Sequence, residues 1–303
     1  MNPTAKSATL EIQPLGVREF DLLRAYIRSV SGIELSSKKM ALVESRLNRR
    51  LLSLGLRSFR EYYIRLLQDD DSECQNMLDR ITTNETSFFR EPAQFELLEE
   101  VVIPRWKEQA RGKRRRKHIR VWSAGCSTGE EPYSVGMCLL HALPRTEGWN
   151  IEIIASDISL EVLEQASHGV YSVDQTQAIP TIYRDKFMLR GRGPQSGKVK
   201  VGTDLHASVR FGRFNLSASH YRFRQPFDLI LCRNVLIYFG RDEKMGAVHR
   251  MLDLLVPDGL FMLGHAESLQ GQTERVRSVR PTVYSLTDAP LFSTDAGQPE
   301  DTL

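Results

Sequence analysis

The chain has 303 residues, of which 41% are hydrophobic and 26% are charged. This composition is typical of an ordinary folded protein, and the length allows one large domain or two smaller ones. The formal net charge of +3, from 41 basic and 38 acidic residues, is too small to indicate nucleic acid as a partner.

Residues 15–80 are expected to form a helical N-terminal domain, after a flexible N-terminus at 1–14. Apolar side chains recur at the helical spacing of about 3.6 residues, at Phe20, Leu23, Ile27 and Val30 and again at Val43, Leu47, Leu51 and Leu54. Gly32 and Gly55 mark the breaks between helices.

The second of these helices follows the candidate caps Ser36 and Ser37 and carries a group of basic residues. These are Lys38, Lys39, Arg46, Arg49 and Arg50. Such charges indicate either a solvated helix face or a docking surface for an acidic partner helix.

The stretch TTNETSFFRE, residues 82–91, belongs to a linking segment that we place at 81–94. Its small polar residues are typical of a cap and turn, because their side chains hydrogen-bond nearby backbone groups. Phe88 and Phe89 are then expected to begin a helix that packs on a core. Taken by itself, the stretch gives no reason for Asn84 and Arg90 to accompany residues that look buried.

From residue 95 the pattern changes to alternating strands and helices, over a domain that we place at 95–287. A helix at about 93–110 and the basic run RGKRRRK (111–117), expected to be a solvated loop, precede the strand IRVWSAG. Further strands are predicted at IEIIASD (151–157), FDLILCRN (227–234) and VPDGLFMLG, with helices at LEVLEQASHG and RDEKMGAVHRMLDLL. Short apolar strands separated by helices indicate an α/β fold with a doubly wound, mostly parallel sheet.

Two segments depart from this alternation. Residues 187–211 alternate with a period of two between glycine-rich turns, which predicts a small antiparallel β insertion. The stretch TERVRSVRPTVYSLT predicts a terminal hairpin at the sheet edge, and the polar residues 288–303 are expected to form a disordered tail.

The cysteines and the distribution of apolar residues favour a cytoplasmic protein. Cys74, Cys126, Cys138 and Cys232 show no CxxC pair and no metal-ligand spacing, so we expect small buried thiols in a reducing compartment. No apolar run approaches the roughly 18 residues of a membrane span. The first residues lack the apolar segment of a signal peptide, and we expect no insertion into a membrane.

Distinctive residues stand where the predicted strands end, which is the edge where open α/β sheets bind ligands. The first strand leads into SAGCSTGEEPYS (123–134), where Gly125 and Gly129 allow a tight turn but depart from the dinucleotide fingerprint G-x-G-x-x-G. Glu130 and Glu131 would repel a pyrophosphate, so they favour a cationic ligand.

The next two strand ends add to this picture. Asp157 is placed to accept hydrogen bonds from both hydroxyls of a ribose, although an acid that caps a helix is the other reading. The segment CRNVLIY (232–238) brings Arg233, Asn234 and Tyr238 to the same edge. A cationic ligand that contains ribose suggests S-adenosyl-L-methionine, which carries a sulfonium.

Five segments, ITTNETSFFRE, VWSAGCSTGEEPYS, IIASDISLEVLEQA, FNL and FDLILCRNVLIYF, resemble in this order the motifs of CheR-type chemotaxis receptor methyltransferases. The resemblance spans about residues 15–285, with counterparts of the family's helical N-terminal domain and small β-subdomain. It implies a class I S-adenosylmethionine-dependent methyltransferase fold. It also implies methyl transfer to glutamate side chains of methyl-accepting chemotaxis receptors, with glutamate methyl esters as the product.

Carried over residue by residue, the resemblance implies a set of cofactor-binding positions: Asn84, Thr86, Arg90, Glu131, Asp157, Asn215, Leu216, Arg233 and Asn234. Arg90 and Tyr238 match the pair beside the reacting carboxylate and are the candidate catalytic residues. Whether Glu130 or Glu131 is the counterpart of the family's acid depends on the alignment of one loop, and Glu131 is favoured. No metal is expected.

The resemblance also implies the partners, which are the methylation helices of receptors. In some members of the family the β-subdomain also binds a C-terminal receptor pentapeptide, and RGRGPQSGKVKV (190–201) resembles the glycine turn of those members. Its other interpretation is a turn that only shields the sheet. A monomer is expected.

Two other functions share parts of this pattern. A nucleic-acid methyltransferase would share the sheet and the cofactor, but its amino-methylating type carries (Asn/Asp)-Pro-Pro-(Tyr/Phe) where this chain has CRNV. A catalytically silent module that senses S-adenosylmethionine is the other alternative. Loss of Arg90 or Tyr238 would have indicated such a module, and both residues are present.

Overall fold

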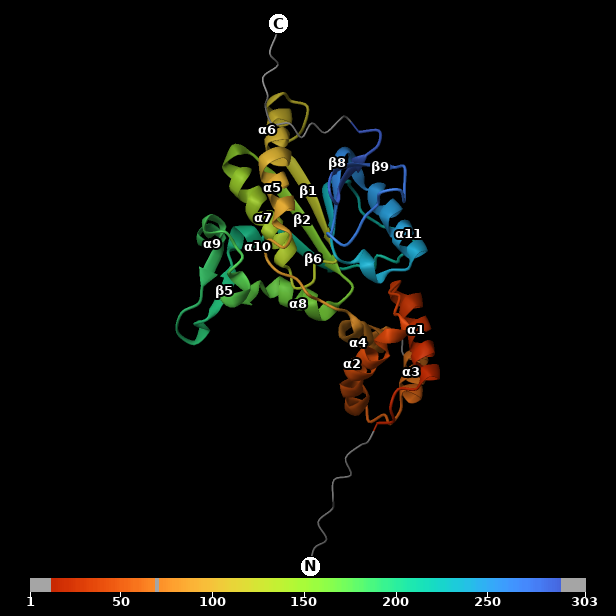
Figure 1. Ribbon diagram of the computed structural model, residues 1–303. Helices are drawn as coiled ribbons and strands as arrows, with labels where there is room; N and C mark the ends of the chain where they lie inside the picture. The colour runs from red at the N-terminus through yellow and green to blue at the C-terminus, as the bar shows by residue number, and fades with distance from the viewer. Residues whose placement is uncertain (1–11, 69–70, 290–303) are drawn as a thin grey trace, which may run out of the picture. The chain divides into compact units, whose positions relative to one another are not determined.

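The computed structural model describes residues 12–68 and 71–289, which divide into two compact units (Figure 1). The first unit contains the described residues through Thr83 together with Tyr238–Gly240, and the second contains Asn84–Ile237 and the described residues from Arg241 onward. The expected flexible N-terminus and disordered tail lie mostly outside the described residues. Among the residues that are described, no helix is long and apolar enough to cross a bilayer.

The first unit consists of helices, as the apolar spacing predicts. They are α1 (Val17–Ser31), the 3₁₀ helix η1 (Ser37–Lys39), α2 (Met40–Ser53), α3 (Phe59–Gln68) and α4 (Ser72–Ile81). The core positions Leu23, Ile27 and Leu47 are fully buried. Gly32 ends α1 in the left-handed conformation, with a φ of 74°, which confirms the predicted break.

Helix α2 uses part of its basic group for internal contacts. The Arg46 guanidinium donates to the carbonyl of Thr82 at 3.0 Å, and Arg50 donates to Glu73, a buried carboxylate, at 3.0 Å. The hydroxyl of Tyr62 also donates to Glu73, at 2.8 Å. Arg46 and Arg50 therefore stabilise the unit, and only the rest of the group (Lys38, Lys39 and Arg49) is exposed.

The second unit is built on a seven-stranded sheet in the order β6-β2-β1-β7-β8-β10-β9. The strands are β1 (His118–Ala124), β2 (Asn150–Asp157), β6 (Val209–Arg213), β7 (Phe227–Cys232), β8 (Leu255–Leu263), β9 (Val276–Arg280) and β10 (Val283–Leu286). The first five strands in this order pair in parallel, and β8, β10 and β9 pair antiparallel. The predicted parallel sheet and edge hairpin are confirmed.

Helices connect and cover these strands (Figure 1). They are α5 (Pro92–Leu97), the π-helix η2 (Leu98–Val102), α6 (Ile103–Arg111), α7 (Glu130–Ala142), α8 (Leu160–His168) and α11 (Arg241–Leu252). Helix α7 packs on β2 and β6, and α11 packs on β8. The near-continuous burial of β1 and β7, and of the second half of β2, reflects a parallel sheet that is covered on its faces.

The β insertion has different limits from those expected. The small antiparallel sheet has the order β3-β5-β4, with β3 (Val170–Ser172), β4 (Met188–Arg190) and β5 (Lys198–Val201), and it includes helix α9 (Thr181–Phe187) between β3 and β4. Helix α10 (Thr203–His206) follows it. Strand β6, expected in the insertion, instead pairs in parallel with β2 and forms an edge of the main sheet. The insertion thus begins before 187 and ends before 211.

Two local expectations are corrected. Phe88 and Phe89 do not begin a helix, because Phe89 has a φ of 51° and Glu91 a φ of 61°, which interrupt any helix, and α5 starts only at Pro92. The basic run is not wholly a solvated loop. Arg115 is only 10% exposed, forms an ion pair with Asp228, and lies over the ring of Trp106 at 5.6 Å.

Candidate cofactor site

The order of the strands identifies the edge where a ligand site is expected. From β1 the chain proceeds to β2 and β6 on one side, and then returns to β7 and β8 on the other side. This reversal between β1 and β7 is the topological switch point at which doubly wound sheets bind ligands. Ala124, Asp157 and Cys232 end the strands β1, β2 and β7 there.

The turn after β1 is shaped by close backbone contacts. Gly125 has a φ of 83°, and a Cβ there would lie 2.3 Å from a methyl carbon of Val235, so only glycine fits. Its N–H donates to the carbonyl of Ser156 at 2.7 Å. Ser127 donates its N–H to Asp157 at 2.9 Å and its hydroxyl to the carbonyl of Asn84 at 3.0 Å. The structure therefore brings Asn84 and Asp157 together around one turn.

Asp157 lies at the end of β2 with 8% of its surface exposed. One carboxylate oxygen accepts the N–H of Ser127, and the other accepts the N–H of Ser159 at 3.0 Å. Ser159 in turn caps α8 through its hydroxyl, which accepts the N–H of Val162. Since a carboxylate has further lone pairs, Asp157 can also accept ribose hydroxyls in this fixed orientation.

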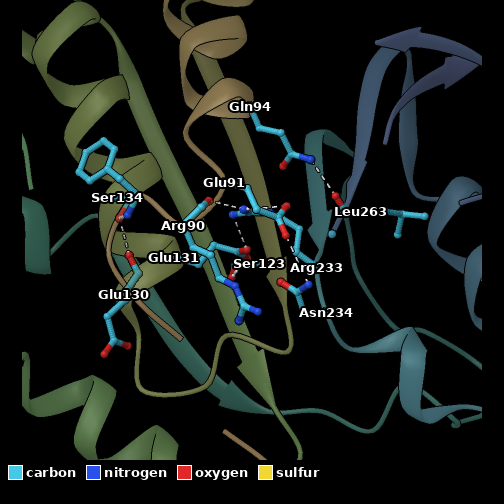
Figure 2. A network of polar contacts seen from close by, with 12 residues as sticks. Arg90, Glu91, Gln94, Ser123, Glu130, Glu131, Ser134, Arg233, Asn234 and Leu263 are labelled. Atoms are coloured by element: carbon cyan, nitrogen blue, oxygen red, sulfur yellow. Dashed lines mark hydrogen bonds and ion pairs between the residues drawn. The ribbon is translucent and has the colours of Figure 1, made fainter. Parts of the chain in front are cut away.

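Arg233, after β7, is the centre of a buried polar network (Figure 2). Its side chain is 2% exposed and forms ion pairs with Glu91 at 3.1 Å and with Glu131 at 3.2 Å. It also donates to the carbonyl of Arg90, while Ser123 donates its hydroxyl to Glu131 at 2.7 Å. Predicted cofactor residues from the linking segment, from α7 and from the end of β7 thus meet in one network.

The carboxylates of this network differ in acidity. Burial raises the pKa of Glu131, against the lowering effects of Arg233 and of the Ser123 hydroxyl. Burial acts on Glu91 in the same direction, but the N–H of His265 and the Arg233 guanidinium together hold the pKa of Glu91 below its ordinary value of 4.5. Arg233 carries one positive charge and faces the two carboxylates of Glu91 and Glu131, so these three side chains have a net negative charge when both glutamates are ionised.

The two adjacent glutamates of α7 have different surroundings. Both oxygens of Glu131 are occupied, by Ser123 and by Arg233. Glu130 accepts the hydroxyl of Thr128 at 2.6 Å, and its carboxylate points away from the network in Figure 2. Burial raises the pKa of Glu130 as well. The choice between Glu130 and Glu131 as a direct ligand stays a prediction.

The segment with Arg90 is held by aromatic contacts. The ring of Phe88 contacts the ring of Tyr171 edge-on, with 4.9 Å between the ring centroids, and the ring of Phe89 stacks on that of Tyr183, with 5.5 Å between the centroids. The N–H of Phe89 also donates to the hydroxyl of Ser134 at 3.0 Å. The Arg90 guanidinium donates to the carbonyl of Glu85 at 2.8 Å. These contacts explain why two phenylalanines accompany polar residues in this stretch: they anchor the backbone that presents Asn84 and Arg90.

Other predicted residues are less closely tied to the network. Asn215 and Leu216 follow β6, and the Asn215 side chain accepts the N–H and the hydroxyl of Ser217, both at 2.9 Å. Thr86 is half-buried in the same segment as Arg90. Tyr238 belongs to the first unit, where its carbonyl accepts the N–H of Glu34 at 2.7 Å, so its pairing with Arg90 stays a prediction.

Asn234 has neighbours that sequence reasoning missed. It has a φ of 58°, its N–H donates to the buried Glu267 at 2.8 Å, and its amide donates to Glu91 at 3.4 Å. A Cβ on Gly264 would lie 2.4 Å from the Asn234 amide, so Gly264 makes room for it. Glu91 directly follows Arg90 at the end of TTNETSFFRE, and this position is a signal that the sequence does contain. Glu267 stands in no motif that sets it apart.

The residues present suit S-adenosylmethionine. Around the switch point, Glu91, Glu130, Glu131 and Asp157 outnumber the guanidinium groups of Arg90 and Arg233. Such a site favours a cation over a polyphosphate. In addition, the Nε of Arg233 is buried and has no hydrogen-bond acceptor in the described part of the protein, so the network retains capacity for a polar ligand.

Comparison with known proteins identifies both units. The family model described as "CheR methyltransferase, SAM binding domain" matches residues 84–285, and the one described as "CheR methyltransferase, all-alpha domain" matches residues 18–82. "Chemotaxis protein methyltransferase 2" of Pseudomonas aeruginosa is 39% identical over 267 residues, which are 88% of this chain and 92% of that protein.

Two further relatives are similar over comparable lengths. The "Chemotaxis protein methyltransferase" of Escherichia coli is 39% identical over 85% of this chain and 86% of its own length. The protein of the same name from Borreliella burgdorferi is 34% identical over 84% of this chain and 88% of its own length. With both of its units matched, this chain belongs to the CheR methyltransferase family and contains its all-α and S-adenosylmethionine-binding domains.

Proposed function

We propose that this protein is a protein-glutamate O-methyltransferase that esterifies glutamate side chains on the cytoplasmic signalling domains of chemoreceptors. The observation that carries this proposal is the similarity, over both units, to relatives named chemotaxis protein methyltransferases. The gathering of Asn84, Asp157 and Arg233 at the switch point of the sheet supports it.

Most of the catalytic effect is expected to come from alignment. S-adenosylmethionine supplies a methyl group made electrophilic by its cationic sulfur. A glutamate carboxylate is already ionised at neutral pH, so the acceptor needs no general base. Asp157 would hold the ribose, and the carboxylates of the network would balance the positive charge of the cofactor. A site that aligns the reactants and excludes water then contributes more than proton transfer could.

Arg90 and Tyr238 are assigned to the reacting end of the site. The Arg90 guanidinium is only half-buried and, within residues 12–68 and 71–289, donates to one backbone carbonyl, so it retains donors for a carboxylate of the cofactor or of the substrate. Tyr238 would fix the substrate oxygen through its hydroxyl. Asn215 and Leu216, with Thr86 and Asn234, complete the proposed cofactor contacts.

The proposed partners are acidic receptor segments. The exposed cations Lys38, Lys39 and Arg49 would attract the glutamate-bearing methylation helices, whereas Arg46 and Arg50 are engaged inside the first unit. The small sheet would bind a receptor's C-terminal peptide at one of its edges. We further propose that the enzyme acts as a monomer in the cytoplasm.

Methyl transfer from labelled S-adenosylmethionine to a panel of receptor signalling domains tests the proposal. We expect label on at least one receptor domain, and we expect mild base to release it, because methyl esters are base-labile. Stable label on RNA would indicate a nucleic-acid methyltransferase instead. Cofactor binding without transfer to any receptor domain would indicate a sensing module.

A further inference from the structure

Glu91 lies at a junction of three chain segments and belongs to none of the predicted site positions. Its side chain is 9% exposed, on a residue whose φ of 61° places the carboxylate beside the end of β7. One oxygen accepts from Arg233 at 3.1 Å. The other accepts from the Asn234 amide at 3.4 Å and from the N–H of His265 at 3.1 Å. Figure 2 shows Glu91 facing Arg233 and Asn234.

We propose that Glu91 is a positioning residue for cofactor binding, which acts by holding the Arg233 guanidinium and the Asn234 amide in their binding orientation. The inference rests on the proposed function of Arg233 and Asn234 as cofactor ligands. Because Arg233 also pairs with Glu131, the orientation of its planar guanidinium depends on both carboxylates. Without the charge of Glu91, Arg233 would keep only Glu131 as a counter-ion among these contacts, with the carbonyl of Arg90 as a neutral acceptor, and its guanidinium would turn toward them.

Anchoring of helix α5 does not account for this arrangement. Gln94, on the same helix, donates to the carbonyl of Leu263 at 2.7 Å and to the hydroxyl of Thr282 at 2.8 Å, so α5 is fixed to the sheet independently. Glu267 likewise holds the backbone of Asn234 and of Gly264, both at 2.8 Å. What Glu91 adds is contact with the side chains of Arg233 and Asn234, the groups that would face a ligand.

The test replaces one carboxylate oxygen and keeps the shape. In Glu91→Gln the new NH₂ must face either Arg233 or the donors of Asn234 and His265, and Arg233 loses a counter-ion. We expect the Kd for S-adenosylmethionine, measured by calorimetry, to rise about 5- to 100-fold. Glu96→Gln, an exposed position on helix α5, which directly follows Glu91, is the matched control and should bind normally.

Coupling to Arg233 separates positioning from a general loss of structure. The effect of Glu91→Gln should be smaller in an Arg233→Lys background than in the wild type, because both changes disturb one contact. If the fold-changes in Kd caused by Glu91→Gln and by Arg233→Lys simply multiply in the double variant, Glu91 does not act through Arg233 and the inference is wrong. Glu91→Asp keeps the negative charge, but its shorter side chain moves the carboxylate away from Arg233 and Asn234. This variant should bind S-adenosylmethionine with intermediate affinity. This variant decides the question if the glutamine variant does not fold, and wild-type affinity in it would overturn the inference.

The experiment also distinguishes this inference from the site on which it rests. Asn234→Gly removes the amide but permits the positive φ, so it tests the proposed cofactor contact directly. If Arg233→Lys and Asn234→Gly weaken binding and Glu91→Gln does not, only the positioning role is wrong. If none of these variants changes the Kd, the proposed site fails together with the inference.

Discussion

Asp157 enters the proposed site with its orientation fixed, because backbone N–H groups of Ser127 and Ser159 bind one oxygen each. Asp157→Ala should weaken S-adenosylmethionine binding by about 1.5–3 kcal/mol, the size expected when hydroxyl groups lose a charged acceptor. Calorimetry checks this, with Glu161→Ala, an exposed acid on the adjacent helix α8, as the control. Unchanged affinity in a folded Asp157→Ala protein would remove Asp157 from the site.

Substitutions of the two candidate catalytic residues, Tyr238 and Arg90, should differ in their effects on kcat and on cofactor affinity. Tyr238→Phe should lower kcat and leave cofactor affinity nearly unchanged, since its proposed contact is to the substrate oxygen. Arg90→Ala should lower kcat and also weaken binding, because Arg90 lies in the segment that carries Asn84. Steady-state kinetics together with calorimetry measure both effects. A loss of cofactor affinity alone, of equal size in both variants, contradicts a substrate-side role for Tyr238.

Glu130 makes stability depend on pH in a defined direction. Burial raises its pKa above the ordinary value of 4.5, so folding favours the protonated form. The stability contributed by this protonated carboxyl is present below pH 4.5 and is lost as pH rises through the raised pKa. Glu130→Gln removes that loss, and glutamine can still accept the Thr128 hydroxyl. The free energy of unfolding of the variant should therefore increase relative to wild type from pH 4.5 to pH 8.

Urea unfolding of both proteins across this range measures the difference. Glu100→Gln, at an exposed position, should show no such trend. A constant difference between Glu130→Gln and wild type would mean that the ionisation of Glu130 is not linked to folding.

At the scale of elements, the sequence predicts those helices and strands in which apolar residues recur at a regular spacing or form a run. The parallel strands β1 and β7 are buried almost throughout and β2 is buried in its second half, so their sequences are mostly apolar. Strand β6 has a single neighbour in the sheet and one exposed face, so its sequence alternates like that of the small sheet, and periodicity alone places it in the insertion. Strand β3 spans only Val170–Ser172, which is too short for a period to appear.

Site residues were predictable where a motif contains them, and their contacts were not. Arg233 and Glu131 were named, but the ion pair between them joins positions 102 apart in the sequence, which no local pattern reveals. The left-handed conformation of Phe89 was equally hidden, since non-glycine residues adopt it only where tertiary contacts compensate.

Three exposed cations of the first unit, two on η1 and one on α2, carry the next prediction. Reversing Lys38, Lys39 and Arg49 to Glu should raise the KM for receptor domains and flatten its salt dependence, because surface charges mainly guide association. Stability should be kept, since these side chains are exposed, in contrast to Arg46 and Arg50. Reversing Arg18, Arg57 and Arg60, which are also exposed in the first unit, gives the same net charge as a control. Equal kinetics of both triple variants at low salt would mean that α2 is a solvated face.

At the scale of the whole molecule, the small sheet supports the proposed cofactor site through the contact of Tyr171 with Phe88, and its edge strands offer a second binding surface. Strand β5 is central and β3 and β4 are its edges, and on β4 Leu189 is 57% exposed. An edge strand offers unpaired backbone groups to a further strand. Four cations, Arg190, Arg192, Lys198 and Lys200, lie on or between β4 and β5. Together they favour an extended acidic peptide with a free C-terminus.

Such a peptide would raise the local concentration of the methylation sites and leave the chemical step unchanged. We therefore expect micromolar binding of an acidic, aromatic-ended receptor C-terminal peptide, with the same Kd in the presence and absence of cofactor. Deleting this tail from a receptor should raise KM and leave kcat unchanged. Arg190→Glu with Lys200→Glu should abolish peptide binding, whereas Arg224→Glu, an exposed charge outside the small sheet, should not. If titration of the peptide gives no heat and tail-less receptors are methylated normally, the small sheet is no tether site, and the methyltransferase assignment is unaffected.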